Sequence, residues 1–496
     1  MTIGMLFKRW KSGLDYVAHS HPLFKKLVVG QVPHASASET CATINQAARF
    51  LVPFFFVLFC FCHQQKFKSP TAVSRLDLLH ALVEKNTFKI DAYERTTTDK
   101  AVYDGHVYSD KAPGTAFLAL PFFYLASGLL SLAGTRLDSE EGWFFSSWFC
   151  CVGALAAVTA VGGACLFRWL CYWSPPRIAL LTTVSLFLGG LPLPYTTLLF
   201  SHSLVVGLLS IALWAIAWTP QPGYVGIRPM YGFLAGFCCG FALASEYTAG
   251  LIIAGLTLGV LRTSANHVGT YILGAIPPLL LIPGYSWACF GDPMVLPYSL
   301  DAFSEMRQGL YAIKWPDLCT GLKLLFSPAR GLLFWSPFLA LTALGYPELF
   351  RKSKLLFLLA FVPPLFHFVI ISGRVWDWPA GPAFGPRFLA PILPLISLPC
   401  ALGMQRCPRI GLALACYSVA VTTFVTLTDA CPDFSSHPNP LLDLNLPLFL
   451  RGQISPNLGT AAGLPVYLSV ALYYILLIVG ACWLWRRLPD IRDRLK

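Results

Sequence analysis

Charged residues are scarce in this chain. Of its 496 residues only 12% are Asp, Glu, Lys or Arg, whereas 56% are hydrophobic. The length alone would suggest about three soluble domains, but this composition excludes them and is typical of a polytopic membrane protein. The formal net charge of +12 does not indicate nucleic-acid binding, because the basic residues lie in short clusters between apolar runs. The expected partner is therefore the membrane.

Metal-binding signatures and internal repeats are also missing. None of the 16 cysteines has the spacing of metal ligands, and most lie in apolar runs, where a thiol behaves as a small hydrophobic group. The acidic residues are dispersed and form no paired motif for a divalent cation. We therefore expect no metal site and no obligatory cofactor, since the sequence does not support a divalent metal. No fixed-period repeat and no soluble domain is found.

Long apolar runs dominate what is present. A window of about 19 residues finds thirteen candidates for membrane spans. They lie at residues 48–62, 115–134, 143–167, 178–195, 203–218, 230–245, 247–262, 269–289, 331–349, 355–372, 387–404, 410–428 and 466–485. We therefore expect a single transmembrane domain over residues 48–485, preceded by a cytoplasmic segment, 1–47, and followed by a cytoplasmic basic tail, 486–496.

The basic clusters restrict how many of these runs cross the membrane. They include the N-terminal segment, Arg168 with Arg177, residues 351–354, residues 406–409 and the C-terminal tail. If all thirteen runs crossed, the two basic termini would lie on opposite sides, against the positive-inside rule. Leaving out residues 115–134, which Pro121 and Gly128 interrupt, puts every cluster on the cytoplasmic side. The alternative is that residues 115–134 form a thirteenth span.

We therefore predict an all-α polytopic membrane protein with about twelve transmembrane helices and both termini in the cytoplasm. Its first outer loop, residues 63–142, is large and carries juxtamembrane helices. A helix with apolar residues at helical spacing is predicted to start near Ser74 and to lie on the membrane surface. The following residues, 96–114, are rich in turn formers and predict irregular backbone.

The loop mixes carboxylates, cations and tyrosines, as suits a site for a phosphorylated, hydroxyl-rich substrate. Its order also resembles the first outer loop of GT-C glycosyltransferases: a span, then Ser74-Arg75-Leu76, a helix, and Tyr108-Ser109-Asp110-Lys111-Ala112-Pro113-Gly114 before an apolar segment. The likeness is greatest to lipid A aminoarabinose transferases and protein O-mannosyltransferases. Arg75 matches the arginine of their Arg-Tyr element, and residues 111–113 match their Lys-Pro-Pro element.

This resemblance implies an inverting glycosyltransferase of the bacterial inner membrane that takes a sugar from a polyprenyl-phosphate donor at the outer face. The acceptor is a lipid, a glycan or a protein. One departure matters: those families carry an acidic residue shortly before the arginine, whereas residues 70–74 contain none. A carboxylate from elsewhere must then accept the proton of the attacking hydroxyl. The candidates are Asp99 first, then Asp91, then Asp110.

Other residues are candidates for binding the substrate. Arg75 and Lys111 are expected to stabilise the charge of the leaving phosphate. His106 and Tyr108 lie in the same loop, and Asp377 and Arg387 lie in a short outer segment with aromatic residues suited to stacking. For each acid of the loop the alternative is an ordinary solvated charge, and for the segment around Asp377 it is an interfacial aromatic belt with a charge pair.

Three further residues are interpreted as structural. Glu246 is expected to be a solvated turn residue, His202 a hydrogen-bonded residue at the membrane interface, and Arg330 either a phosphate ligand or a side chain that snorkels. Two other functions stay open for the whole chain. A transporter or flippase predicts ionisable groups at span centres and repeat symmetry, both of which are lacking. A noncatalytic envelope-assembly protein is consistent with the missing acidic residue.

Overall fold

The computed structural model of the protein describes residues 37–64, 69–217, 229–261, 265–305, 307, 313–433 and 435–489. Most of the predicted N-terminal segment, 1–47, and of the basic tail, 486–496, therefore lies outside the described residues. The elements below come from the described part of the chain.

Among the described residues, eight helical segments are long and apolar enough to cross a membrane. They are Cys41–Cys60 in α3 (Ala37–Cys60), Gly114–Leu132 (α5), Glu140–Leu170 (α6, Glu140–Cys150, and α7, Ala157–Leu170), His267–Phe290 (α13, Ala265–Leu279, and α14, Leu281–Phe290), Lys354–Ser372 (α18), Arg387–Arg406 (ending in α19, Leu393–Arg406), Pro408–Thr428 (α20) and Val466–Arg487 (α23). Because lipid offers no partners to backbone polar groups, apolar segments of this length satisfy those groups as helices. The predicted all-α polytopic membrane fold is confirmed, whereas the count of twelve spans stays a prediction.

Shorter helices complete the bundle. They are α8 (Pro176–Leu188), α9 (Pro192–Thr196), α10 (Ser201–Ala217), α11 (Pro229–Ser245), α12 (Gly250–Val260), α15 (Leu318–Phe326), α16 (Leu332–Trp335), α17 (Thr342–Lys352), α21 (Leu446–Leu450) and α22 (Leu458–Ala461). Close packing of α11 against α13 requires glycine. A β-carbon at Gly236 of α11 would collide with the carbonyl oxygen of Tyr271 in α13, and one at Gly274 of α13 would collide with that of Phe233.

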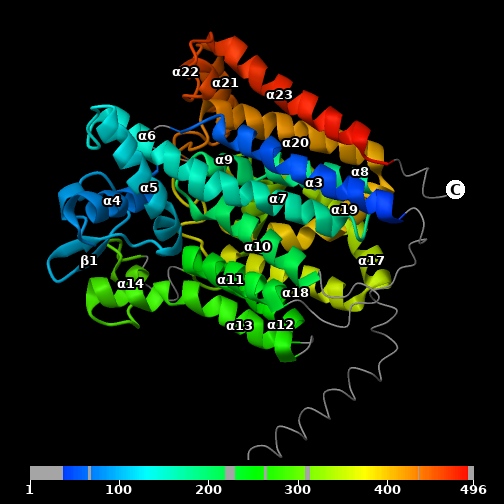
Figure 1. The fold of residues 1–496 in the computed structure, drawn as a ribbon, viewed down its shortest axis with the longest axis horizontal. Coiled ribbons are helices and arrows are strands. Elements are labelled where there is room, and N and C mark those ends of the chain that lie inside the picture. The colour runs from blue at the N-terminus through cyan, green and yellow to red at the C-terminus, as the bar shows by residue number, and fades with distance from the viewer. Residues whose placement is uncertain are drawn as a thin grey trace, which may run out of the picture.

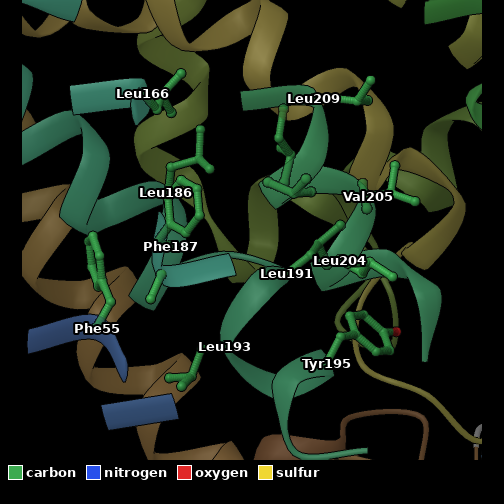
Figure 2. Packing of buried hydrophobic residues seen from close by; sticks show 14 of the residues in the cluster. Phe55, Leu166, Leu186, Phe187, Leu191, Leu193, Tyr195, Leu204, Val205 and Leu209 are labelled. Atoms are coloured by element: carbon green, nitrogen blue, oxygen red, sulfur yellow. The ribbon is translucent and has the colours of Figure 1, made fainter. Parts of the chain in front are cut away.

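The core of the bundle is built from α3, α7, α8 and α10. Figure 2 shows Phe55 of α3 beside Phe187 of α8, and their ring centroids lie 5.5 Å apart. Leu204 and Leu209 of α10 are fully buried in the same cluster. These side chains make the helices around the site a rigid support, since interiors of this kind are close-packed.

The chain leaves the bundle after α3 and returns to it at the same end. Trp148 Nε1 of α6 donates a hydrogen bond to the Cys60 carbonyl oxygen at the end of α3 over 3.3 Å, and Ser147 Oγ lies 3.1 Å from His63 Nε2. Figure 1 shows α4 (Pro70–Lys85), α5, β1 (Ala101–Tyr103) and α14 gathered at this end, opposite α17. This is the arrangement expected if residues 115–134 do not cross, although α5 is long and apolar enough to do so. We call this end the loop end.

The structure corrects two expectations about the loop itself. The helix α4 starts at Pro70, not near Ser74, because proline is favoured in the first turn of a helix, where its missing N–H costs nothing. Protein, not the membrane surface, covers it: its residues from Thr71 to Ala81 are buried. The predicted irregular backbone contains a hairpin of β1 and β2 (His106–Tyr108), whose turn residues Asp104 and Gly105 both have positive φ, 50° and 73°.

Candidate functional site

Two hydroxyl groups of α4 contact two acidic residues of the loop, Asp99 and Asp110. Thr71 Oγ1 donates a hydrogen bond to Asp99 Oδ2 over 2.7 Å. Ser74 Oγ lies 3.3 Å from Asp110 Oδ1 and shares a hydrogen bond of 2.8 Å with Ser109 Oγ. Residues three apart on a helix face the same side, so one face of α4 meets both acids. This face of α4 therefore lines the candidate site.

Lys111 joins the same two acids. Its Nζ lies 2.7 Å from Asp99 Oδ2 and 2.6 Å from Asp110 Oδ2. The three side chains differ in exposure: Asp110 is fully buried, Lys111 is 8% exposed and Asp99 is 21% exposed. Lys111 therefore crosslinks a buried carboxylate to one that still reaches the surface of the site.

Charges in this cluster shift the pKa values in opposite directions. Burial opposes ionisation of Asp99, but the charge and hydrogen bond of Lys111, with the Thr71 hydrogen bond, outweigh it and hold the Asp99 pKa below its usual value. Burial raises the pKa of Asp110 despite Lys111. The pKa of Lys111 is raised, because Asp110 and Asp99 outweigh its burial. Asp99 is thus a carboxylate and Lys111 an ammonium group at neutral pH.

Arg387 approaches Asp99 through the same threonine. It lies in the turn Arg387–Ile392, and its Nη1 donates a hydrogen bond to Thr71 Oγ1 over 3.3 Å. Its guanidinium carbon lies 5.1 Å from the ring centroids of both Phe200 and Phe388, within the range of cation–π contacts. Its Nε is buried and has no hydrogen-bond partner among the described residues. Arg387 thus keeps donor capacity for an anion.

Arg75 lies deeper than Arg387 and is held by protein groups. Its Nη1 donates to the carbonyl oxygens of Thr71, at 3.2 Å, and Leu199, at 3.3 Å, and its Nη2 lies 3.5 Å from Ser201 Oγ. The side chain is only 2% exposed. Burial lowers the pKa of Arg75, although Tyr298, Glu246 and Asp110 oppose this shift. Arg75 therefore connects α4 to the start of α10.

A second carboxylate, Glu246, faces Arg75 through Ser201. Ser201 Oγ donates to Glu246 Oε2 over 2.8 Å, Thr248 Oγ1 donates to Oε1 over 3.0 Å, and His202 Nδ1 lies 3.7 Å from Oε2. Glu246 and His202 are 7% and 2% exposed. The expectation that Glu246 is a solvated turn residue is wrong, because its side chain is buried. His202 packs against the rings of Tyr195, Phe200 and Phe388, with centroid distances of 5.0, 5.8 and 6.0 Å. A lone Glu between two apolar runs was the only signal in the sequence.

Two residues from the segment after α14, Tyr298 and Asp301, also lie near the cluster, and no pattern in the sequence points to them. The Lys111 Nζ lies 5.5 Å from the ring centroid of Tyr298. Asp301 is 3% exposed, and its backbone pairs with that of Ala101, the first residue of β1. Burial, with the nearby charge of Asp110, raises the pKa of Asp301 to about 7. This segment therefore adds an aromatic ring and a third acidic residue near Lys111.

Four predicted site residues lie apart from the cluster of Lys111, Asp99 and Asp110 and make contacts elsewhere: Asp91, His106, Tyr108 and Asp377. Asp91 Oδ2 lies 2.8 Å from His106 Nδ1, and its Oδ1 accepts a hydrogen bond from the Val107 amide over 2.7 Å, so these residues brace the hairpin. Both of the paired side chains are largely exposed. Tyr108 is buried and packs against Phe290 with a centroid distance of 5.4 Å.

Asp377 pairs with Arg374, whose Nη2 lies 2.7 Å from its Oδ2. Arg330, left open as a phosphate ligand or a snorkelling side chain, is fully buried. It donates from Nε to the carbonyl oxygen of Pro379 over 2.9 Å and from Nη2 to those of Gly381 and Pro432 over 3.0 Å each. Arg330 therefore holds two loops together and has no free access to a phosphate.

The fold and the loop define a polytopic, all-helical membrane protein with a buried ionic cluster at one end of its bundle. No family model matches the sequence, and no curated protein matches it. Among solved structures, the chain is similar to ArnT from Cupriavidus metallidurans, whose crystal structure was determined with undecaprenyl phosphate bound. The identity is 16%, the match covers 91% of this chain and 78% of that one, and the TM-score is 0.45. This likeness concerns the overall fold alone.

Proposed function

We propose that this protein is an inverting glycosyltransferase that moves a sugar from a polyprenyl-phosphate donor to a lipid, glycan or protein acceptor at the outer face of the membrane. The observation that carries the proposal is the arrangement around Thr71. Its hydroxyl group donates to the Asp99 carboxylate and accepts from the Arg387 guanidinium. The proposed base, Asp99, and the proposed phosphate-binding group, Arg387, thus both contact the Thr71 side chain. Sugar transfer from a phosphate donor requires a base and an anion-binding group.

The reaction follows from these two groups. The acceptor hydroxyl attacks the anomeric carbon, its proton passes to Asp99, and the bond from that carbon to the phosphate oxygen breaks. Inversion results because attack and departure occur on opposite faces of the sugar. The electron pair leaves with the lipid phosphate, whose charge Arg387 stabilises. A guanidinium group suits this role because its planar donors match a phosphate.

Geometry favours Asp99 over the other two candidate bases. Asp110 is fully buried beside Lys111, so it does not reach an acceptor, and burial raises its pKa. Asp91 is occupied by His106 and the Val107 amide in the hairpin. Asp99 is ionised and partly exposed, and Lys111 with Thr71 fixes its position. In this proposal Lys111 acts mainly on Asp99, and Arg75 supports α4 behind Arg387.

The test measures the release of polyprenyl phosphate, a product common to all donors of this class. Purified full-length protein in lipid nanodiscs would be incubated with a panel of polyprenyl-phosphate sugars and a membrane lipid extract as the source of acceptor. We expect release by the wild type and a loss of about 100- to 10,000-fold in kcat for Asp99→Asn, the range for a general base. Donor binding by Asp99→Asn should stay normal, since the substitution removes charge and keeps shape.

Asp91→Asn is the matched control, because it makes the same chemical change in the same loop outside the cluster. It should keep wild-type turnover. Normal turnover by Asp99→Asn, with a dead Asp91→Asn or Asp110→Asn, would move the base to another residue. A wild type that binds no donor and releases no product would contradict the enzyme and favour the noncatalytic envelope-assembly alternative.

A further inference from the structure

The residues that lead to Asp99 are tied to α4 at three successive points. We call residues 91–99 the Asp99 loop. Thr96 Oγ1 lies 2.7 Å from Asp77 Oδ2, Thr97 Oγ1 donates to the Pro70 carbonyl oxygen over 3.0 Å, and Thr71 Oγ1 holds Asp99 itself. The Asp99 amide in turn donates to Thr97 Oγ1 over 3.1 Å. The position of the proposed base therefore depends on how firmly this loop is held.

The Thr96 hydroxyl group has one proton and two acceptors within reach. Its Oγ1 lies 2.7 Å from Asp77 Oδ2 and also 2.7 Å from the Tyr93 carbonyl oxygen. A hydroxyl group donates only one hydrogen bond at a time. Both contacts are satisfied only when Asp77 carries a proton, because Asp77 then donates to Thr96 Oγ1 while Thr96 donates to Tyr93. The geometry therefore selects the neutral form of Asp77.

The surroundings of Asp77 select the same form. The residue is fully buried, and its Oδ1 has no hydrogen-bond partner among the described residues. No lysine or arginine of the described chain forms an ion pair with it. A buried carboxylate without a counter-ion is costly, so the group takes up a proton instead. Burial raises the pKa of Asp77 to about 7, even though the Thr96 hydrogen bond lowers it.

The other titratable groups near Asp77 leave this assignment intact. On α4 itself, His80 Nδ1 lies 2.8 Å from Glu84 Oε1, and the His80 ring stacks on Trp143 of α6. From the Asp99 loop, the Tyr93 hydroxyl donates to Glu84 Oε2 over 2.7 Å. Glu84 and Asp138, which precedes α6, are both acidic and act on the pKa of Tyr93 together with Asp77. None of these groups supplies Asp77 with a positive partner.

We propose that Asp77 is a positioning residue that regulates the site: its protonated carboxyl group fastens the Asp99 loop to α4, and loss of that proton loosens the loop. The fastening is a property of the chain on its own, whereas its effect on sugar transfer rests on the proposed function. The sign follows from linkage. A carboxyl group whose pKa is raised in the folded protein contributes stability that is present at low pH and is lost as the pH rises through that pKa.

Hydrogen exchange tests the fastening without any substrate. Full-length protein in nanodiscs would be exchanged at about pH 5.5 and about pH 8.5, with rates corrected for intrinsic exchange, and the amides of residues 94–99 followed by mass spectrometry. The Thr96 and Asp99 amides are hydrogen-bonded and report on the loop. Between about pH 5.5 and the folded pKa near 7, a span of about 1.5 pH units, protection should fall by up to about thirtyfold in the wild type and should change little at higher pH. Asp77→Asn should keep high protection at both pH values, since an amide donates to Thr96 and does not ionise.

Two further variants complete the design. Asp104→Asn makes the same substitution at an exposed turn of the neighbouring hairpin and should keep the pH dependence of the wild type. Thr96→Val removes the hydroxyl group that contacts Asp77 and should lower protection at both pH values. This variant keeps the test decisive if Asp77→Asn does not fold. Equal wild-type protection at both pH values, an unchanged pH dependence in Asp77→Asn, or wild-type protection in Thr96→Val would each overturn the proposal.

The turnover assay adds a separate arm. If the protein is the proposed transferase, kcat should fall as the pH rises above about 7, and Asp77→Asn should remove that fall while KM for the donor stays the same. A pH-dependent loop in a protein without turnover would sink the proposed function alone. If kcat decreases at alkaline pH by the same amount in Asp77→Asn as in the wild type, the positioning role of Asp77 alone would be contradicted.

Discussion

Arg387 Nη1 donates a hydrogen bond to Thr71 Oγ1 over 3.3 Å, and the two residues are 316 positions apart in the sequence. The contact joins the entry of α19 to the first turn of α4. It places the guanidinium group near Asp99, which accepts from the same threonine. The first prediction concerns this arginine.

If the proposed function holds, Arg387→Ala should weaken binding of a polyprenyl phosphate by about ten- to hundredfold, because hydrogen bonds to a charged group contribute about 1.5 to 3 kcal/mol. Arg387→Lys should restore only part of the affinity, since the planar fork is lost. Binding of the lipid to protein in nanodiscs measures both effects. Arg136→Ala, at an exposed arginine paired with Asp138, is the control and should bind normally. Wild-type affinity in Arg387→Ala would show that other groups hold the phosphate.

Lys111 should be essential for stability, because its removal leaves Asp99 and Asp110 without their shared counter-ion. Breaking a buried ion pair from one side costs about 3 to 5 kcal/mol, so Lys111→Met should lower Tm strongly in detergent. Adding Asp110→Asn to this variant should recover part of the loss. Lys100→Met removes a more exposed pair with Glu94 and should cost about 0 to 1 kcal/mol. Similar Tm values for the two lysine variants would contradict a structural role of the cluster.

Acid should destabilise the cluster through Asp99. Lys111 and Thr71 hold the pKa of Asp99 below its usual value in the folded protein. The stability that this group contributes is present above the pKa of the unfolded chain and is lost as the pH falls through the folded value. Thermal unfolding of wild type and Asp99→Asn at a series of acidic pH values measures it. The Tm difference between them should shrink as the pH falls, and a difference that grows would contradict the ion pair.

Transfer should proceed without an obligatory divalent metal. The carboxylates nearest the proposed reaction centre, Asp99 and Asp110, are already engaged by Lys111. Chelation with EDTA followed by dialysis should leave the release of polyprenyl phosphate unchanged. Loss of activity that added Mg²⁺ or Mn²⁺ restores would show that a metal takes part.

A reporter fused after Lys496 should read cytoplasmic. The expectation comes from the basic clusters, and it also fits a chain that leaves and re-enters the bundle at one end between α3 and α6. Fusions to green fluorescent protein and to alkaline phosphatase give opposite signals and measure the location. An external C-terminus would mean that residues 115–134 cross the membrane.

The sequence by itself determined the class of protein and the part of the chain that carries the candidate site. Hydropathy depends on local composition, so the long apolar helices and the polar loop were readable without a structure. The polar residues of the first outer loop predict Asp99 and Asp110 as residues of interest, and the later outer segment with aromatic residues predicts Arg387. The local sequence predicts a helix start near Ser74, because serine is a favoured N-cap residue, whereas the helix starts at Pro70.

Only the tertiary structure decided which of these residues meet and which groups are buried. Glu246 and Asp301 have ordinary neighbours in the sequence, yet both are buried, because segments distant in sequence cover them. Asp91 and Asp99 belong to the same loop, but one braces a hairpin while the other lies beside Lys111. A side chain's burial and partners depend on contacts between distant segments, and a single sequence does not record those contacts.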